Sequence, residues 1–205
     1  RRGAGGDVSA SAAEREWAAS AELRGPSFAD AVRPGPRLVA VGAVPLAGAL
    51  TRLARAAGWR PFVIDPRARF ATGQEFPDVE AVILAWPREG FERSGGIEAS
   101  TAIVVLAHDP VLDDPALEIA LRSPARYVGA MGSRRTQIAR RQRLSAAGLS
   151  DAELDRLAGP AGLDLGARTA DETALAILAE IVAVAHDRAG GRLADSAGPI
   201  HTEAP

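Results

Sequence analysis

The chain lacks cysteine and lysine, and it has no long apolar run. Without a cysteine among its 205 residues it offers no disulfide, no thiolate metal site and no cysteine nucleophile. The apolar runs are far shorter than a bilayer span and no signal peptide is apparent, so we expect a cytoplasmic protein without membrane association. The formal net charge of −2 disfavours a general nucleic-acid binder, because such domains usually carry a basic excess.

The length and composition of the chain suffice for one α/β domain with a buried core. Apolar residues make up 47% of the chain and charged residues 24%, which is typical of a globular protein. Residues 1–36 are rich in glycine, alanine and serine and end in Pro-Gly-Pro, so we expect a linker or an N-terminal remnant there. We expect the folded domain over residues 37–188 and a loosely ordered C-terminal tail over residues 189–205.

Within the expected domain, short apolar runs alternate with helical patterns. The strand candidates are LVAVG, RPFVID, EAVILAW, TAIVVLAH and YVGAM. Helical patterns cover residues 45–57, 133–147, 150–158 and 169–186. The alternation predicts an α/β, Rossmann-like fold with a mostly parallel sheet and helices on both faces. The last two helices open with capping boxes, at Ser150 with Glu153 and at Thr169 with Glu172, so these acids are expected to be structural.

The turn after the first strand only partly matches a dinucleotide-binding motif. A GxGxxG motif lets the backbone approach a pyrophosphate at a helix N-terminus, but this chain has GAVP from Gly42. Val44 replaces the second glycine, and its Cβ atom would crowd a pyrophosphate. Asp65 ends the second run where a ribose-binding acid would lie, although an acid in a turn before Pro66 is the alternative. We expect Gly42 and Asp65 to border a ligand site, with NAD(P) as the less favoured ligand.

Two polar pairs follow the fourth apolar run. His108 and Asp109 lie at the carboxyl end of that predicted strand, where an imidazole beside a carboxylate can orient a ligand or move a proton. The alternative is that Asp109 caps the turn while His108 covers the strand end, and we favour the ligand site. Asp113 and Asp114 indicate a helix start with Asp114 as N-cap before Pro115, and no metal site is expected.

The most distinctive feature is a basic segment, YVGAMGSRRTQIARRQR, that begins at Tyr127. Seven arginines and no acid lie from Arg122 to Arg143, although the chain as a whole is slightly acidic. We interpret Arg140, Arg141 and Arg143 as an ordinary solvated helix face. The function is therefore expected to depend on the first part of the segment.

That first part predicts an anion-binding turn. Gly129 and Gly132 permit positive φ or a close backbone approach, and Ser133 is a natural N-cap. Arg134 and Arg135 follow in the first helical turn, where cations oppose the helix dipole unless an anion is bound. Backbone N–H groups, the serine hydroxyl and a guanidinium would together hold a phosphate or pyrophosphate.

A glycine-bounded loop, PAGLDLGA over residues 160–167, precedes the last predicted helix. Such a loop can line a pocket, with Asp164 as its polar contact. It can equally be a tight connector, and the residues alone leave both readings open.

Several segments are specific enough to compare with a known family. They are VLAHDPVLDDPALEIALRS at 105–123, YVGAMGSRRT at 127–136, GLDLGARTADETALAILAEI at 162–181 and GPIH at 198–201. Together they resemble the Rossmann-like domain of the XdhC/CoxI family, accessory factors that mature molybdenum hydroxylases. The chain departs from that family at the first turn, where many members carry GAGH. It also has no match to the N-terminal domain of full-length members, which carries a cysteine in a glycine-rich motif.

The resemblance implies a protein that binds the molybdenum cofactor, protects it during sulfuration and passes it to an apo-enzyme of the xanthine dehydrogenase or CO dehydrogenase type. The cofactor is a pterin with a phosphate, which suits an anion site at Gly132 to Arg135. Implied partners are the apo molybdenum hydroxylase and a cysteine desulfurase, and a homodimer is a further alternative. We expect a chaperone without turnover; a small NAD(P)-dependent oxidoreductase and a scaffold that only docks a target enzyme are the competing hypotheses.

Overall fold

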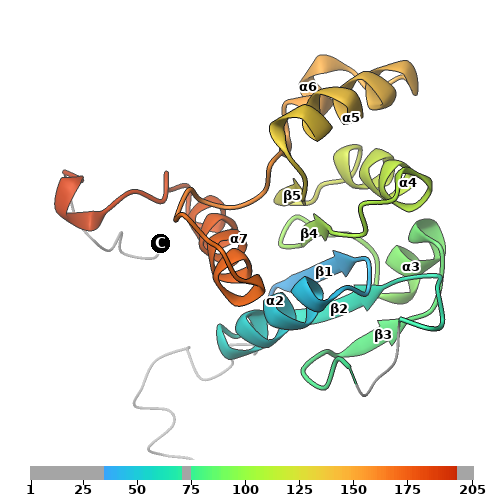
Figure 1. Ribbon diagram of the computed structural model, residues 1–205, viewed down its shortest axis with the longest axis horizontal. Helices are drawn as coiled ribbons and strands as arrows, with labels where there is room; N and C mark the ends of the chain where they lie inside the picture. The colour runs from blue at the N-terminus through green and yellow to red at the C-terminus, as the bar shows by residue number, and fades with distance from the viewer. Residues whose placement is uncertain (1–34, 71–74, 198–205) are drawn as a thin grey trace, which may run out of the picture. The chain divides into compact units, whose positions relative to one another are not determined.

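The computed structural model describes residues 35–70 and 75–197. The sheet at its centre has the strand order β3-β2-β1-β4-β5-β6, and every described strand pair is parallel (Figure 1). This order is that of dinucleotide-binding folds, so the predicted Rossmann-like fold is confirmed. The strands are β1 (Arg37–Val41), β2 (Arg60–Ile64), β3 (Ala81–Ile83), β4 (Ala102–Val105), β5 (Tyr127–Ala130) and β6 (Leu157–Ala158).

The order of the strands reverses at β1. From β1 the chain runs outward to β2 and β3 on one side, and then returns to β4 on the other side. Val39 is therefore aligned with Phe62 of β2 and with Ile103 of β4. In open parallel sheets, the crevice at the carboxyl ends of the strands beside such a reversal is where ligands bind.

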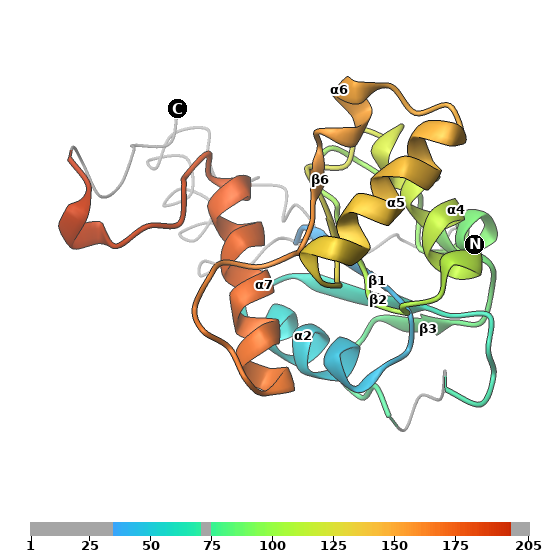
Figure 2. The same ribbon diagram turned by 45° about the horizontal axis from the view of Figure 1, so that its top comes forward.

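Helices cover both faces of the sheet, in agreement with the prediction. α2 and α7 lie side by side on one face, over Leu38 and Ala40, and α3, α4 and α5 lie on the other, over Val39 and Val41 (Figures 1 and 2). The alternation follows from the period of two along each strand. The helices are α2 (Pro45–Ala56), α3 (Pro87–Arg93), α4 (Pro110–Leu121), α5 (Arg134–Ala146), α6 (Asp151–Leu154) and α7 (Ala170–Ala185), followed by a 3-10 turn at Leu193–Asp195.

Small side chains let α2 and α7 approach closely. The buried face of α2 includes Ala47, Leu50 and Ala54, and the facing side of α7 buries Ala174 and Ile177. Alanine also has the highest helix propensity, so the same residues favour the helix and its close packing. Both predicted capping boxes are present, at the starts of α6 and α7.

Two predicted helix boundaries are wrong. Of the helix expected over residues 150–158, only α6 forms, and Leu157–Ala158 form β6 beside β5, because a two-residue strand leaves no periodic pattern. The helix after β4 begins at Pro110, five residues before Pro115, because Asp109 is its N-cap and accepts a hydrogen bond from the Val111 amide. Asp114 is thus inside α4 and caps nothing.

Some predictions fall outside the described residues. They include nearly all of the expected N-terminal linker, the last eight residues of the tail and the GPIH segment. Among the helices of the described ranges, none combines the length and the hydropathy of a membrane-spanning segment. The same ranges contain no cluster of three or more acidic or histidine side chains that could hold a metal ion.

Candidate ligand site at the carboxyl edge of the sheet

The reversal point of the sheet brings Gly42 against the loop that follows β4. Gly42 has a φ of 107°, and a Cβ atom added to it would lie 2.7 Å from the Ala107 amide nitrogen. Only glycine tolerates both the conformation and the close approach. His108, whose φ is 57°, follows as an exposed residue, and Asp109 caps α4. The structure therefore places Gly42, His108 and Asp109 together, as expected for strand ends at one edge.

Asp65 lies at the same edge, but its carboxylate is fully engaged within the protein. The Ala43 amide donates to Oδ2 at 2.8 Å, and the Arg67 amide donates to Oδ1 at 2.8 Å. The Arg67 guanidinium adds a bidentate pair at 2.9 and 2.7 Å. Asp65 has no exposed surface, so these contacts leave no oxygen facing solvent for a ribose.

The charge of Asp65 is stabilised in place. Burial by itself raises the pKa of Asp65, but the hydrogen bonds from Arg67 and Ala43 outweigh it and hold that pKa below its ordinary value. The carboxylate thereby ties the first turn to the segment after β2. Arg67, which was not predicted as a site residue, makes this possible, and its only sequence signal was its position two residues after Asp65.

In the turn between β5 and α5, the expected glycine with positive φ and the expected serine N-cap are both present. Gly132 has a φ of 135°, and Ser133 is the N-cap of α5, with its hydroxyl accepting from the Thr136 amide at 3.1 Å. Arg134 and Arg135 are exposed, and neither pairs with a carboxylate among the described residues. A capped helix start that carries two cations and no acid in its first turn can bind an anion through backbone and side chain together.

Gly129 lies one strand residue before this turn and is buried. A Cβ atom at Gly129 would come within 2.6 Å of the Tyr127 ring, so the absence of a side chain leaves room for that ring. The hydroxyl of Tyr127 donates to Glu180 Oε2 at 2.5 Å, and the Gly162 amide donates to the same oxygen at 2.7 Å. Packing therefore accounts for Gly129 without a ligand contact.

Glu180 anchors the loop that contains Asp164. The loop follows β6 and passes the carboxyl end of β5, where the Ala161 amide donates to the Ala130 carbonyl, and it is then held to α7 through Gly162 and Glu180. Asp164 itself is exposed and, over the described residues, engages in no hydrogen bond. The loop is thus a fixed connector at its start, with Asp164 projecting from its free part.

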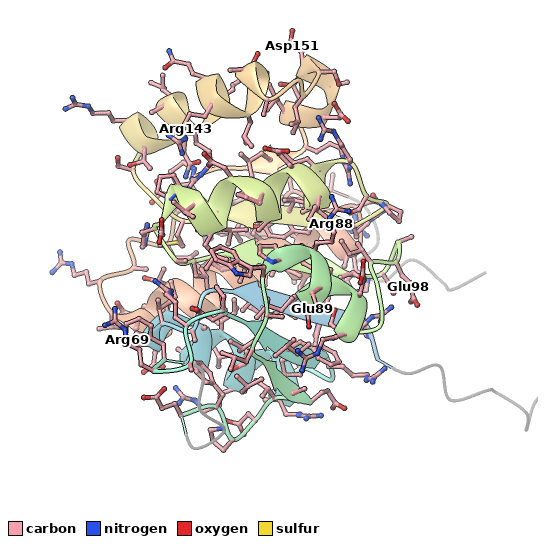
Figure 3. All side chains as sticks on the ribbon, turned by 90° about the vertical axis from the view of Figure 1, so that its right-hand side faces the viewer. Arg69, Arg88, Glu89, Glu98, Arg143 and Asp151 are labelled. Atoms are coloured by element: carbon pink, nitrogen blue, oxygen red, sulfur yellow. The ribbon has the colours of Figure 1, made fainter. Side chains whose placement is uncertain are left out.

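The interpretation of three arginines as one solvated face is wrong for Arg140. Its side chain is 2% exposed and forms an ion pair with Asp113, also 2% exposed, at 3.2 Å. Burial raises the pKa of Asp113 although the charge of Arg140 opposes that effect. Arg143, by contrast, is 41% exposed and pairs with Asp114, and Figure 3 shows it between α5 and α4. Arg141 is likewise exposed and pairs with Asp155.

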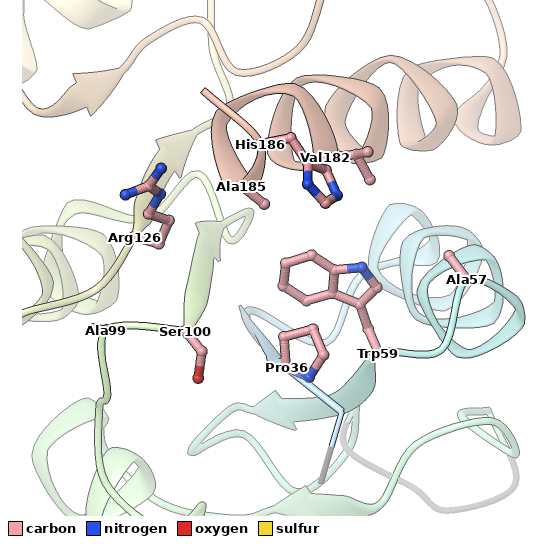
Figure 4. Close-up of a pocket in the computed structure, with 9 residues that line it drawn as sticks. All are labelled: Pro36, Ala57, Trp59, Ala99, Ser100, Arg126, Val182, Ala185 and His186. Carbon is pink, nitrogen blue, oxygen red and sulfur yellow. The ribbon is translucent and has the colours of Figure 1, made fainter. Parts of the chain in front are cut away.

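A cavity of about 750 Å³ lies at the opposite, amino edge of the sheet (Figure 4). The indole of Trp59, just before β2, faces His186, the C-cap of α7, across it, and Arg126 lies to one side. None of the predicted site residues lines this cavity, and no sequence motif indicated it.

The parallel sheet, whose strand order reverses at β1, and the helices on both of its faces define a Rossmann-type domain. The family model described as the XdhC Rossmann domain matches residues 38–181. The chain belongs to this family, as the resemblance predicted.

Comparisons with individual proteins agree with the family. The chain is 37% identical over 91 residues to the molybdenum cofactor insertion chaperone PaoD of Escherichia coli K12, covering 44% of this chain and 29% of PaoD. It is 27% identical over 155 residues to a probable xanthine dehydrogenase subunit of Bacillus subtilis 168, covering 76% of this chain and 44% of that protein.

A solved structure also matches the fold. The crystal structure of a xanthine dehydrogenase from Bacillus halodurans is 28% identical and has a TM-score of 0.65, covering 80% of this chain and 45% of that chain. The chain thus spans less than half the length of these relatives.

Proposed function

We propose that this protein binds the molybdenum cofactor and assists its insertion into a molybdenum hydroxylase of the xanthine dehydrogenase or CO dehydrogenase type. The observation that carries the proposal is membership of the XdhC Rossmann family together with similarity to a molybdenum cofactor insertion chaperone. The family relation supplies the ligand class, and the exposed turn after β5 supplies matching chemistry.

The proposed phosphate contacts come from the β5–α5 turn. The cofactor is a pterin that carries a phosphate, and the backbone after Gly132, the Ser133 hydroxyl and the guanidinium groups of Arg134 and Arg135 are suitable donors. His108 is exposed at the end of the neighbouring strand, on the same edge of the sheet. We place the pterin ring between that residue and the β5 turn, and we propose Asp164 on the 160–167 loop as a further polar contact.

Sulfuration requires a partner in this proposal. The chain contains no cysteine, so none of its residues can carry the sulfur as a persulfide. A cysteine desulfurase is the proposed donor, and the apo molybdenum hydroxylase is the proposed recipient of the cofactor. The protein itself would hold and orient the ligand without turnover.

Anaerobic binding of released molybdenum cofactor to the purified protein tests the proposal. We expect the Arg134→Ala, Arg135→Ala variant to lose roughly tenfold or more in affinity, because each guanidinium removed is a charge-assisted contact. The matched control is Arg52→Ala, Arg55→Ala, which removes the same charge from ion-paired positions on α2. The proposal fails if wild type does not bind the cofactor, or if both double variants bind it alike.

The NAD(P)-dependent oxidoreductase is the second hypothesis, and the first turn weighs against it. Asp65 is engaged by Arg67 and Ala43, and Val44 stands where a dinucleotide motif has its second glycine. Saturable fluorescence titrations with NADH or NADPH would support it.

A further inference from the structure

A largely buried chain of polar contacts, running through Gln137 and Arg140, begins at the proposed phosphate-binding turn. Arg140 Nη1 donates to the Met131 carbonyl at 3.1 Å and to Gln137 Oε1 at 2.6 Å. Gln137 Nε2 in turn donates to the Ala130 carbonyl at 3.0 Å. Both carbonyls belong to the end of β5 and the residue that follows it, so Gln137 and Arg140 hold the backbone that leads into Gly132.

The same chain continues to the neighbouring strand end. Arg140 Nη2 donates to Asp113 Oδ2 at 3.2 Å, and Asp113 belongs to the first turn of α4. The Asp113 amide donates to the Asp109 carbonyl at 2.7 Å, which joins it to the loop containing His108. One guanidinium therefore connects the turn after β5 with the loop after β4.

This ion pair is poorly suited to a purely stabilising role. Both side chains are 2% exposed, and burying two charges costs free energy that a single 3.2 Å contact recovers only in part. Asp113 Oδ1 and Arg140 Nε are buried and find no hydrogen-bond partner over the described residues. The exposed pair Arg143–Asp114 already joins the same two helices through two hydrogen bonds.

We propose that Arg140, with Asp113, is a positioning residue that sets the separation and orientation of the 107–109 loop and the 131–135 turn so that one ligand contacts both. This inference rests on the proposed function, since it assumes that the ligand is the molybdenum cofactor. Arg140 touches no ligand itself and acts through the backbone of Met131 and through α4.

Cofactor affinity in a matched pair of variants tests the inference. Arg140→Met keeps an unbranched apolar stem but removes the contacts to Met131, Gln137 and Asp113, and we expect affinity for released molybdenum cofactor to fall about tenfold, as for misplaced binding groups. The control Arg143→Met removes the exposed pair between the same helices and is expected to stay within about twofold of wild type. Arg140→Lys should recover part of the affinity, because an ammonium can reach only some of the acceptors.

Affinities are measured anaerobically at a temperature where circular dichroism shows each variant folded. Should Arg140→Met not fold, Gln137→Met takes its place. It keeps the ion pair, removes the side-chain donor to the Ala130 carbonyl and the acceptor of Arg140 Nη1, and is expected to weaken binding about threefold or more. Equal affinity of wild type and the Arg140→Met or Gln137→Met variant would overturn the inference, as would an equal loss in Arg143→Met. If wild type nevertheless binds the cofactor strongly, and this binding depends on Arg134 and Arg135, the inference is lost but the proposed function holds. No binding by wild type overturns both.

Discussion

The turn after β1 and the turn after β5 have similar roles in the fold, but their polar groups are engaged differently. Both are strand–turn–helix connections at the carboxyl edge, and both have a glycine with positive φ, Gly42 at 107° and Gly132 at 135°. In the first turn, the Ala43 amide is taken by Asp65, and α2 has no side-chain cap. In the second, Ser133 caps α5 and two arginines remain exposed.

The difference shows that a turn's sequence motif does not decide alone whether the turn is free to bind a ligand. The first turn is closed by a carboxylate from the next strand, which Arg67 holds in place. In the second turn, Gln137 and Arg140 donate to backbone carbonyls on the inner side, so the outer side of the turn stays exposed. Substitutions in the first turn should therefore mainly lower stability. Substitutions of the exposed side chains in the second turn should mainly lower ligand affinity.

The largest effect on stability is expected for Gly42→Ala. The new Cβ atom would meet the Ala107 backbone at 2.7 Å in a strained conformation, so we expect a loss of about 3–5 kcal/mol in the free energy of unfolding. Gly132→Ala is the matched variant: its Cβ would meet the Thr136 side chain at 3.1 Å, and about 1–2 kcal/mol is expected. Urea denaturation measures both, and equal losses would contradict the contrast between the turns.

Asp65→Ala is expected to follow, with a loss of about 2–3 kcal/mol at pH 7, because it leaves the Ala43 amide and Arg67 without their acceptor. The pKa of Asp65 in the folded protein lies below its unfolded value of about 3.9, so its stabilising effect is present above that value. It is lost as the pH falls through the folded pKa.

Urea denaturation of wild type and Asp65→Ala between pH 7 and pH 3 measures this dependence. The difference between the two stabilities should begin to shrink below about pH 3.9, the unfolded pKa of an aspartate. Asp171→Ala serves as the control, since it breaks an exposed pair with Arg52 and is expected to cost less than about 0.5 kcal/mol. A difference between wild type and Asp65→Ala that does not shrink on acidification would contradict the assignment.

Tyr127→Phe, in the strand that leads to the second turn, should lower the free energy of unfolding by an intermediate amount. Burial, reinforced by Glu180, raises the pKa of Tyr127, so the phenol remains a donor to that carboxylate. Removing the hydroxyl leaves Glu180 with the Gly162 amide, and we expect a loss of about 1–2 kcal/mol. Hydrogen exchange of the Gly162 amide should become faster in the variant; unchanged exchange would mean that Tyr127 does not help to anchor the loop.

The main strands could be predicted from sequence because central parallel strands are buried on both faces and appear as continuous apolar runs. Each of the five expected runs forms a strand. β6 and the seven-residue helix α3 were missed, since neither is long enough to show a period. The start of α4 was misplaced because Asp109-Pro110 and Asp114-Pro115 carry the same capping signal.

The sequence could predict only those site residues whose position depends on their own local segment. His108 and Ser133 follow apolar runs, so their place at the carboxyl edge could be inferred from the runs themselves. Asp113 and Arg140 are 27 residues apart in sequence and become buried only because α4 and α5 pack on the same face. No local pattern distinguishes such an arginine from its exposed neighbours Arg141 and Arg143.

The smallest effect on stability is expected at Arg134 and Arg135, where the proposed effect on ligand binding is largest. Arg134→Ala, Arg135→Ala should change the free energy of unfolding by less than about 0.5 kcal/mol, because both side chains are exposed and cations at a helix N-terminus do not stabilise it. Added inorganic phosphate should raise the melting temperature of wild type more than that of this variant, since a bound anion stabilises only the folded state. Arg52→Ala, Arg55→Ala corrects for the general effect of phosphate on folded proteins and should respond as wild type does. A loss above about 1 kcal/mol in Arg134→Ala, Arg135→Ala would show that these arginines support the fold, and the two turns would then differ less than their contacts indicate.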